Sequence, residues 1–119
     1  MYGLPEDFDG AFFVGCTLEL VCFSENQVSL RFDGDLSVTI ESSFSYQKEP
    51  SESSGQVVKV PTSESDLMQL IGHSVAEVSA SRDGTLILTF TNRHVFRCFD
   101  DSSQFESYHI KRGTIEIHV

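Results

Sequence analysis

Apolar and polar residues alternate strictly in residues 28–32, and in the segment 85–90 the large apolar residues Leu86, Leu88 and Phe90 alternate with Thr85, Ile87 and Thr89. This alternation is typical of a β-strand with one buried and one solvent-facing side, because successive side chains point to opposite faces. Asp33-Gly34 and Asp83-Gly84 flank these segments, and both residue types tolerate the positive φ of tight turns. The pattern therefore predicts two units built from antiparallel hairpins.

The two units belong to an internal repeat. Laid on itself at an offset of 57, which becomes 58 after one inserted residue, the chain matches itself in a shared pattern. The pattern is G-x-x-[LV]-x-x-V-x-x-S, a polar turn, [VL]-x-L-x-F and a Gly or Asn turn. Each copy predicts a three-stranded meander, and we expect a single domain whose duplication spans about residues 13–46 and 70–110.

Both copies share one irregular step, near Glu19 in the first and near Ala76 in the second. Apolar positions lie three residues apart there instead of two. A β-bulge, in which one strand carries an extra residue, would restore the facing of the apolar side chains. The shared irregularity favours a structural equivalence of the two copies.

A short helix is expected before the second copy. Ser63 is a suitable N-cap, acidic residues follow it, and Leu67, Leu70 and Ile71 fall on one helical face. Gly72 then stands where a helix commonly ends with a glycine.

The remaining segments complete the expected fold. A weaker helical counterpart covers residues 5–14, a polar loop covers 47–56, and residues 57–60 predict an edge strand. Residues 106–119 predict a terminal hairpin with its turn at 111–113. The sum is seven to nine strands and one or two short helices. We expect a mainly β (α+β) fold, in which a curled or two-layer antiparallel sheet buries the Phe, Leu and Val faces of both meanders.

The chain is strongly acidic, with 18 acidic and 8 basic residues and a formal net charge of −10. Such a chain repels nucleic-acid phosphates and anionic lipids, so we expect neither direct nucleic-acid binding nor a membrane association. A basic protein partner would instead be attracted. The longest apolar run is residues 11–14 and the first residues carry no basic group, so a cytoplasmic location is expected. Three cysteines without C-x-x-C spacing predict reduced thiols.

Motifs for catalysis are missing from the sequence: there is no G-x-S-x-G, no phosphate-binding lysine loop, no dinucleotide fingerprint and no H-E-x-x-H. The sequence therefore predicts a protein that is not an enzyme and needs no cofactor. His109 and His118 flank Lys111 and Arg112, which leaves acid–base chemistry on phosphate as an alternative. The two acids of residues 33–35 are too few for a calcium loop, so we expect a turn there and no metal site.

Acidic residues gather in the predicted turns, and aromatic residues accompany the last of them. Carboxylates can steer a basic partner and rings can anchor it, although the same pattern fits a solvated rim with core-facing rings. If several turns share one end of the sheet, these charges form one negative rim. The residues expected to contact a partner are Glu25, Asp33, Asp35, Asp83, Asp100, Asp101, Phe105, Glu106 and Tyr108.

Three segments carry a resemblance to a known family: L-x-F-D-G from Leu30, G-T-L-x-L-x-F-x-N from Gly84, and F-E-S-Y at residues 105–108. Over most of the chain, the sequence resembles a family of small bacterial proteins of unknown function. That resemblance implies a bacterial origin and a compact β-rich fold, and it brings no known site. In size, acidity and lack of catalytic groups the chain is also similar in physical type to immunity proteins that neutralise basic nuclease toxins.

These observations favour an inhibitor or immunity protein whose negative rim covers the cationic active site of a secreted toxin domain. The main alternative is a small-ligand or peptide binder that uses a cavity between the two meanders. A third possibility is a phosphoesterase or nuclease that uses His109 and His118.

Overall fold

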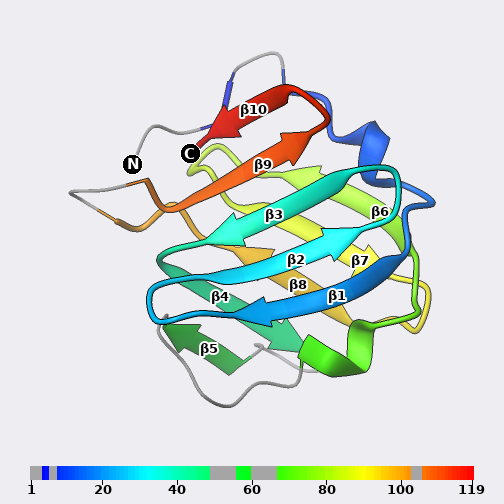
Figure 1. Ribbon diagram of the computed structural model, residues 1–119. Coiled ribbons are helices and arrows are strands. Elements are labelled where there is room, and N and C mark those ends of the chain that lie inside the picture. Colours follow the sequence, from blue (N-terminus) through cyan, green and yellow to red (C-terminus); the bar gives the residue numbers. More distant parts are fainter. Residues whose placement is uncertain (1–3, 6–7, 49–55, 60–66, 103–105) are drawn as a thin grey trace.

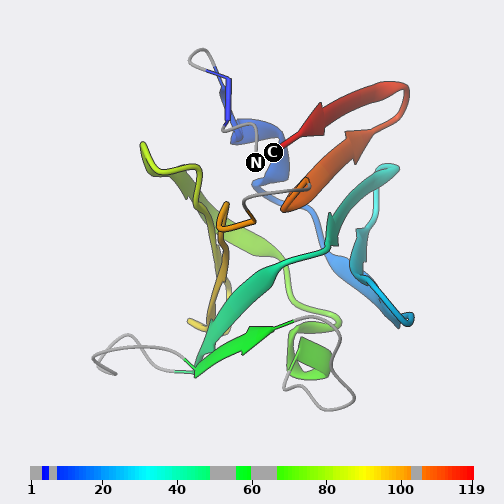
Figure 2. The ribbon, with the colours of Figure 1, turned by 90° about the vertical axis from the view of Figure 1, so that its left-hand side faces the viewer.

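A computed structural model describes residues 4–5, 8–48, 56–59, 67–102 and 106–119, the side chains of 56–59 excepted. Ten strands lie among these residues and form two five-stranded sheets in which every pairing is antiparallel. Figure 1 shows one sheet in front of the other, and Figure 2 shows them as separate layers. The mainly β, two-layer fold expected from the sequence is confirmed.

The strand order in the first sheet is β1-β2-β3-β9-β10 and in the second β5-β4-β8-β7-β6. The strands of the first sheet are, in that order, Leu18–Phe23, Val28–Phe32, Leu36–Ile40, Tyr108–Arg112 and Ile115–His118. Those of the second sheet are Gln56–Lys59, Ser43–Gln47, Val95–Cys98, Leu86–Phe90 and Val75–Ala80. Two short 3-10 helices, η1 (Ala11–Phe13) and η2 (Leu67–Leu70), precede the two copies.

Both predicted meanders are present, as β1-β2-β3 and β6-β7-β8. The predicted bulges are confirmed as well, because the register of β1 shifts between Leu18 and Leu20 and that of β6 between Val75 and Glu77. The inward faces of both meanders contribute to one buried cluster of mainly Phe, Leu, Val and Ile side chains. Alternation and turn chemistry were sufficient to predict this part of the fold.

Each copy passes its last two strands to the other sheet. The hairpin β4-β5 follows the first meander in the chain, yet β4 pairs with β8 of the second. In the same way β9-β10 follows the second meander, and β9 pairs with β3 of the first. Both sheets therefore contain strands of both copies. The strand Ser43–Gln47 was not predicted, and it brings the number of strands above the expected seven to nine.

A pseudo-two-fold relation joins the copies where β1 and β6 begin. The hydroxyl groups of Thr17 and Ser74, which occupy equivalent positions 57 residues apart, lie 2.8 Å from each other. The neighbouring backbone bonds repeat the relation, from Gly15 N to Val75 O (2.9 Å) and from Gly72 N to Leu18 O (2.8 Å). The offset seen in the sequence thus reappears as a symmetric set of contacts.

The helix expected before the second copy is reduced to the 3-10 helix η2 in the described residues, and Ser63 lies outside them. Leu67 and Leu70 are fully buried as predicted, but Ile71 is 42% exposed, so its place on the buried face was wrong. Gly72 has φ +89°, in keeping with the expected glycine after the helix. The counterpart expected over residues 5–14 is only η1.

The terminal hairpin turns two residues later than predicted. Arg112 pairs with Ile115, so the turn consists of Gly113 and Thr114, and Lys111 belongs to β9. Gly113 has φ +60°, a conformation that glycine adopts without strain.

The first and last residues of the loop expected over residues 47–56 belong to strands. Gln47 belongs to β4 and Gln56 to β5, while residues 49–55 lie outside the described residues. The edge strand expected over residues 57–60 is confirmed as β5, which is the first strand of its sheet.

All three cysteines are free thiols, as expected; Cys98 is buried, and burial raises the pKa of its thiol. No helix in the described part of the chain is long and apolar enough to cross a bilayer.

Candidate functional site

The turns of each sheet fall at two opposite ends of the molecule, because consecutive turns of a meander alternate between ends. One end holds the β1-β2 and β6-β7 turns together with the passages from β3 to β4 and from β8 to β9. We name it the crossover end; in Figure 1 the β1-β2 turn and the start of β4 mark it at the left. The β2-β3 and β9-β10 turns lie at the opposite end.

Most of the acidic residues predicted to contact a partner come together at the crossover end. Glu25 lies in the β1-β2 turn, Asp83 in the β6-β7 turn, Asp100 and Asp101 follow β8, and Glu106 precedes β9. One further carboxylate, that of Glu41, follows β3 and was not among the predicted residues. In the part of the chain that the structure describes, the six carboxylates of the crossover end are Glu25, Glu41, Asp83, Asp100, Asp101 and Glu106.

Asp33 and Asp35 do not join this group, because the β2-β3 turn lies at the opposite end. The carboxylate of Asp33 accepts a hydrogen bond from the backbone N–H of Thr17 (2.9 Å). Asp35 adopts φ +60°, and its carbonyl oxygen accepts a bond from the N–H of Gly113 (3.1 Å). Both acids therefore shape a turn far from the crossover end. Phe105 lies outside the described residues.

Basic residues have the opposite distribution. Five of the eight basic residues lie in the half of the molecule away from the crossover end, namely Arg31, Lys48, Arg93, Lys111 and Arg112. The crossover end holds Arg82 in the β6-β7 turn, and Lys59 pairs with Ser43 there. The eighth basic residue, Arg97, lies in β8 one residue before Cys98, on the side of the crossover end. Among the described residues, six carboxylates thus lie at this end, whose half of the molecule holds three basic residues, while the described part of the other half also carries Asp33, Asp35 and further glutamates and is nearly balanced.

Some acids of the crossover end also hold the exchanged strands together. The carboxylate of Asp101 accepts hydrogen bonds from the hydroxyl groups of Ser42 and Ser43, and thereby joins the two passages between sheets. Asp100 accepts a bond from the hydroxyl of Ser107 (2.9 Å). These bonds fix the positions of the two carboxylates, and Asp101 remains exposed to solvent.

The carboxylate of Asp83 is exposed and held by its own turn. It accepts hydrogen bonds from the hydroxyl of Ser81 (2.5 Å) and from the backbone N–H of Thr85 (3.1 Å). These hydrogen bonds hold the pKa of Asp83 below its usual range. Asp83 therefore carries its negative charge over a wide pH range.

Tyr108 is a core residue, and its predicted place on the partner-binding surface was wrong. Its side chain is fully buried, and its hydroxyl donates a hydrogen bond to the carbonyl oxygen of Gly84 (2.6 Å). Burial raises the pKa of the phenol well above its ordinary value. Tyr108 links the start of β9 to the β6-β7 turn and has no surface to offer a partner.

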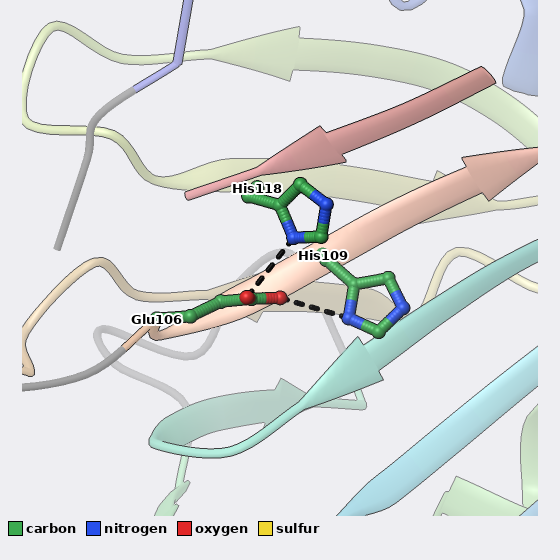
Figure 3. Close-up of side chains that lie close together, drawn as sticks. All are labelled: Glu106, His109 and His118. Carbon is green, nitrogen blue, oxygen red and sulfur yellow. Dashed lines mark hydrogen bonds and ion pairs between the residues drawn. The ribbon is translucent and has the colours of Figure 1, made fainter.

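Glu106, His109 and His118 form a compact cluster on the outer face of the first sheet, at its crossover end (Figure 3). One carboxylate oxygen of Glu106 lies 2.9 Å from Nδ1 of His109, and the other lies 2.9 Å from Nδ1 of His118. The ring centroids of the two histidines are 5.4 Å apart. Within the described part of the chain, these side chains place their possible ligand atoms within 4.8 Å of one another, close enough to hold a metal ion.

The sequence analysis singled out all three residues, but it did not bring them together. A turn at 111–113 would have paired His118 with Glu106 and separated it from His109. The observed turn at Gly113 and Thr114 makes the two histidines cross-strand partners. A two-residue turn containing Gly113 is the signal that could have revealed the cluster.

A family model described as a family of unknown function (DUF6188) matches residues 11–118. The chain belongs to this family. The resemblance noted in the sequence is thereby confirmed as one to a β-rich family of unknown function. No curated protein and no solved structure matches the chain. The part that matches the DUF6188 family runs from η1 to β10, so it contains the crossover end and the Glu106 cluster.

The pKa of His118 is expected to fall when Glu106 is replaced by Gln. The hydrogen bond to Glu106 and the negative charge of that carboxylate raise the pKa of His118 above its ordinary value. Any stabilisation from this pair is therefore complete below the unfolded-state pKa and is lost as pH rises through the folded-state pKa. An NMR titration of the imidazole protons in metal-free protein measures the change. An unchanged pKa in Glu106→Gln would show that the pair does not form.

The described surface also includes two grooves of several hundred cubic ångströms. A groove of about 410 Å³ runs over the outer face of the first sheet beside His109 and is lined by hydroxyl groups together with Arg31 and Lys111. A second, of about 610 Å³, lies along β6 beside the segment Phe8–Ala11. The space between the two meanders is occupied by the side chains of the core.

Proposed function

We propose that this member of the DUF6188 family is an acidic binding protein of the inhibitor or immunity type, which recognises a basic protein partner through its crossover end. The observation that carries the proposal is the segregation of charge. Among the described residues, six carboxylates lie at this end, whose half of the molecule holds three basic residues, while five of the eight basic residues lie in the other half.

Such a distribution suits a partner whose own surface is cationic, such as the active site of a nuclease toxin domain. A concentrated negative surface steers a basic partner toward the correct end of the molecule and raises the association rate by about 10- to 1000-fold at low salt. The hydrogen bonds to Asp83, Asp100 and Asp101 hold these carboxylates in place before the partner arrives. Less side-chain entropy is then lost on binding.

Charge reversal at the crossover end tests the proposal. In the double variant Glu25→Lys, Glu41→Lys, we expect the dissociation constant for a basic nuclease-type toxin domain that the wild type binds to rise about tenfold or more at low salt. The matched control is Glu19→Lys, Glu77→Lys, which changes the net charge equally with two exposed residues away from the crossover end. It should change the dissociation constant less than about threefold.

Surface plasmon resonance at several salt concentrations gives the dissociation constant and both rate constants. The proposal requires the association rate of the wild type to fall as salt increases. Equal effects of the two double variants, a dissociation constant independent of salt, or no binding to any basic toxin domain tested would contradict it.

A further inference from the structure

The register of the terminal hairpin places His109 and His118 side by side. Tyr108 and Val119 exchange two backbone hydrogen bonds, with N···O distances of 2.9 and 3.4 Å. The next pair along the ladder, His109 and His118, is therefore a pair without mutual hydrogen bonds. Such pairs have Cα atoms about 4.5 Å apart, which is the closest approach in an antiparallel sheet. Both imidazoles accordingly share the outer face, with their rings tilted by 35°.

A bulge at the start of β9 brings the third side chain to the same face. The backbone N–H groups of Ser107 (2.6 Å) and Tyr108 (3.4 Å) both donate to the carbonyl oxygen of Val119, so two residues oppose one. Without the extra residue, strict alternation would point Glu106 inward with the buried Tyr108. With it, Glu106 is 23% exposed and bridges the two histidines (Figure 3).

We propose that Glu106, His109 and His118 form a binding site for a divalent transition-metal ion, of which zinc is the best match. Two imidazole nitrogens and one carboxylate oxygen are a typical zinc ligand set that leaves a fourth position open. Calcium and magnesium prefer oxygen ligands and are disfavoured by the two imidazoles. This inference does not require the proposed partner binding, and the two share only Glu106.

The distances in the cluster fit a metal ion after a small movement. Ligand atoms in a tetrahedral zinc site lie roughly 3.4 Å apart, so the two 2.9 Å separations would open by about 0.5 Å, and any wider separation among the ligand atoms, all within 4.8 Å of one another, would close toward the same value. Coordination through Nδ1 leaves Nε2 of His118 free to face the carboxylate of Glu116, 3.9 Å away. A carboxylate behind the ring is a common outer partner of metal-bound histidine. The surplus of carboxylates at the crossover end also attracts cations to the site.

Calorimetric titration of the full chain with zinc chloride, after removal of metals with EDTA, tests the site. We expect one zinc ion per chain, a dissociation constant of about 1 µM or lower, and a higher melting temperature with zinc. Calcium and magnesium should produce neither effect. Cobalt(II) should give the visible absorption of a tetrahedral or five-coordinate complex.

Single variants assign the ligands. His109→Ala, His118→Ala and Glu106→Gln should each weaken zinc binding at least about tenfold. His73→Ala is the matched control, because His73 lies outside the cluster and its removal should leave the affinity unchanged. All three cluster side chains are partly exposed, so each variant should fold, and the melting temperature without metal verifies this.

The proposal is overturned if zinc binding is not saturable at one ion per chain, or if His73→Ala weakens it as much as His118→Ala. Unchanged affinity in Glu106→Gln would remove the carboxylate from the site and would equally overturn the three-ligand assignment. Should an alanine variant fail to fold, His118→Gln gives the same test with a side chain of similar size.

Discussion

Phe90→Ala should lower the free energy of unfolding by about 3–5 kcal/mol, because it removes a fully packed ring from the interface between the two copies. Phe90 is 1% exposed and stacks on Phe32, its equivalent in the first copy, with ring centroids 6.3 Å apart and planes 17° from parallel. No neighbouring ring can fill the gap without breaking another contact, since Phe32 also packs edge-on against Phe13. Urea denaturation followed by circular dichroism measures the loss.

Phe23→Ala provides the control for this prediction. Phe23 belongs to β1 but is 41% exposed, so its removal should cost less than about 1 kcal/mol. Phe32→Ala should resemble Phe90→Ala, because both rings occupy equivalent places. A loss for Phe90→Ala as small as that for Phe23→Ala would mean that the stacked pair does not join the copies.

The exchange of hairpins explains why such a loss should affect the whole molecule. Each sheet contains three strands of one copy and two of the other, so neither copy can separate without breaking β4 from β8 and β9 from β3. We therefore expect one cooperative transition in which both copies unfold together. Parallel unfolding curves from circular dichroism and from tyrosine fluorescence would indicate this behaviour.

Local sequence patterns predicted what local physics determines. The alternation at residues 28–32 and 86–90 correctly predicted the meanders, and the three-residue steps near Glu19 and Ala76 correctly predicted the bulges. The strand β4 was not predicted from the sequence. Its polar residues Ser43, Ser45 and Gln47 are buried, whereas polar residues in a sequence are normally interpreted as facing solvent. No local pattern shows that this strand pairs with a partner about fifty residues later.

The candidate site was predictable in its residue types and less so in its geometry. Turns collect acidic residues, and this rule found five of the six carboxylates of the crossover end. It also included Asp33 and Asp35, because it did not take into account that consecutive turns of a meander lie at opposite ends of the sheet. Tyr108 lies two residues before Ile110 and therefore points to the same face of the strand, which was the available sign that Tyr108 is a core residue. The pairing of His109 with His118 was missed because the predicted turn of the terminal hairpin began two residues too early.

Gly84→Ala should lower the free energy of unfolding by about 3 kcal/mol, from backbone strain and a steric clash together. Gly84 is buried and has φ +90°, where a residue with a side chain is strained by about 1–2 kcal/mol. A Cβ atom here would lie 2.7 Å from Cβ of Asp100 and 2.8 Å from its carboxylate, closer than packed atoms approach. The first of these contacts involves the stem of the side chain, so a rotation of Asp100 cannot relieve it.

Gly34→Ala separates the two contributions. Gly34 has φ +73° in the β2-β3 turn, but an added Cβ there meets nothing within 4 Å. Its cost should therefore be the backbone strain alone, about 1–2 kcal/mol. The excess cost at Gly84 measures the contact with Asp100, whose bond to Ser107 helps to hold the start of β9. Equal losses in the two variants, measured by the same urea titration, would show that the β6-β7 turn does not press against Asp100.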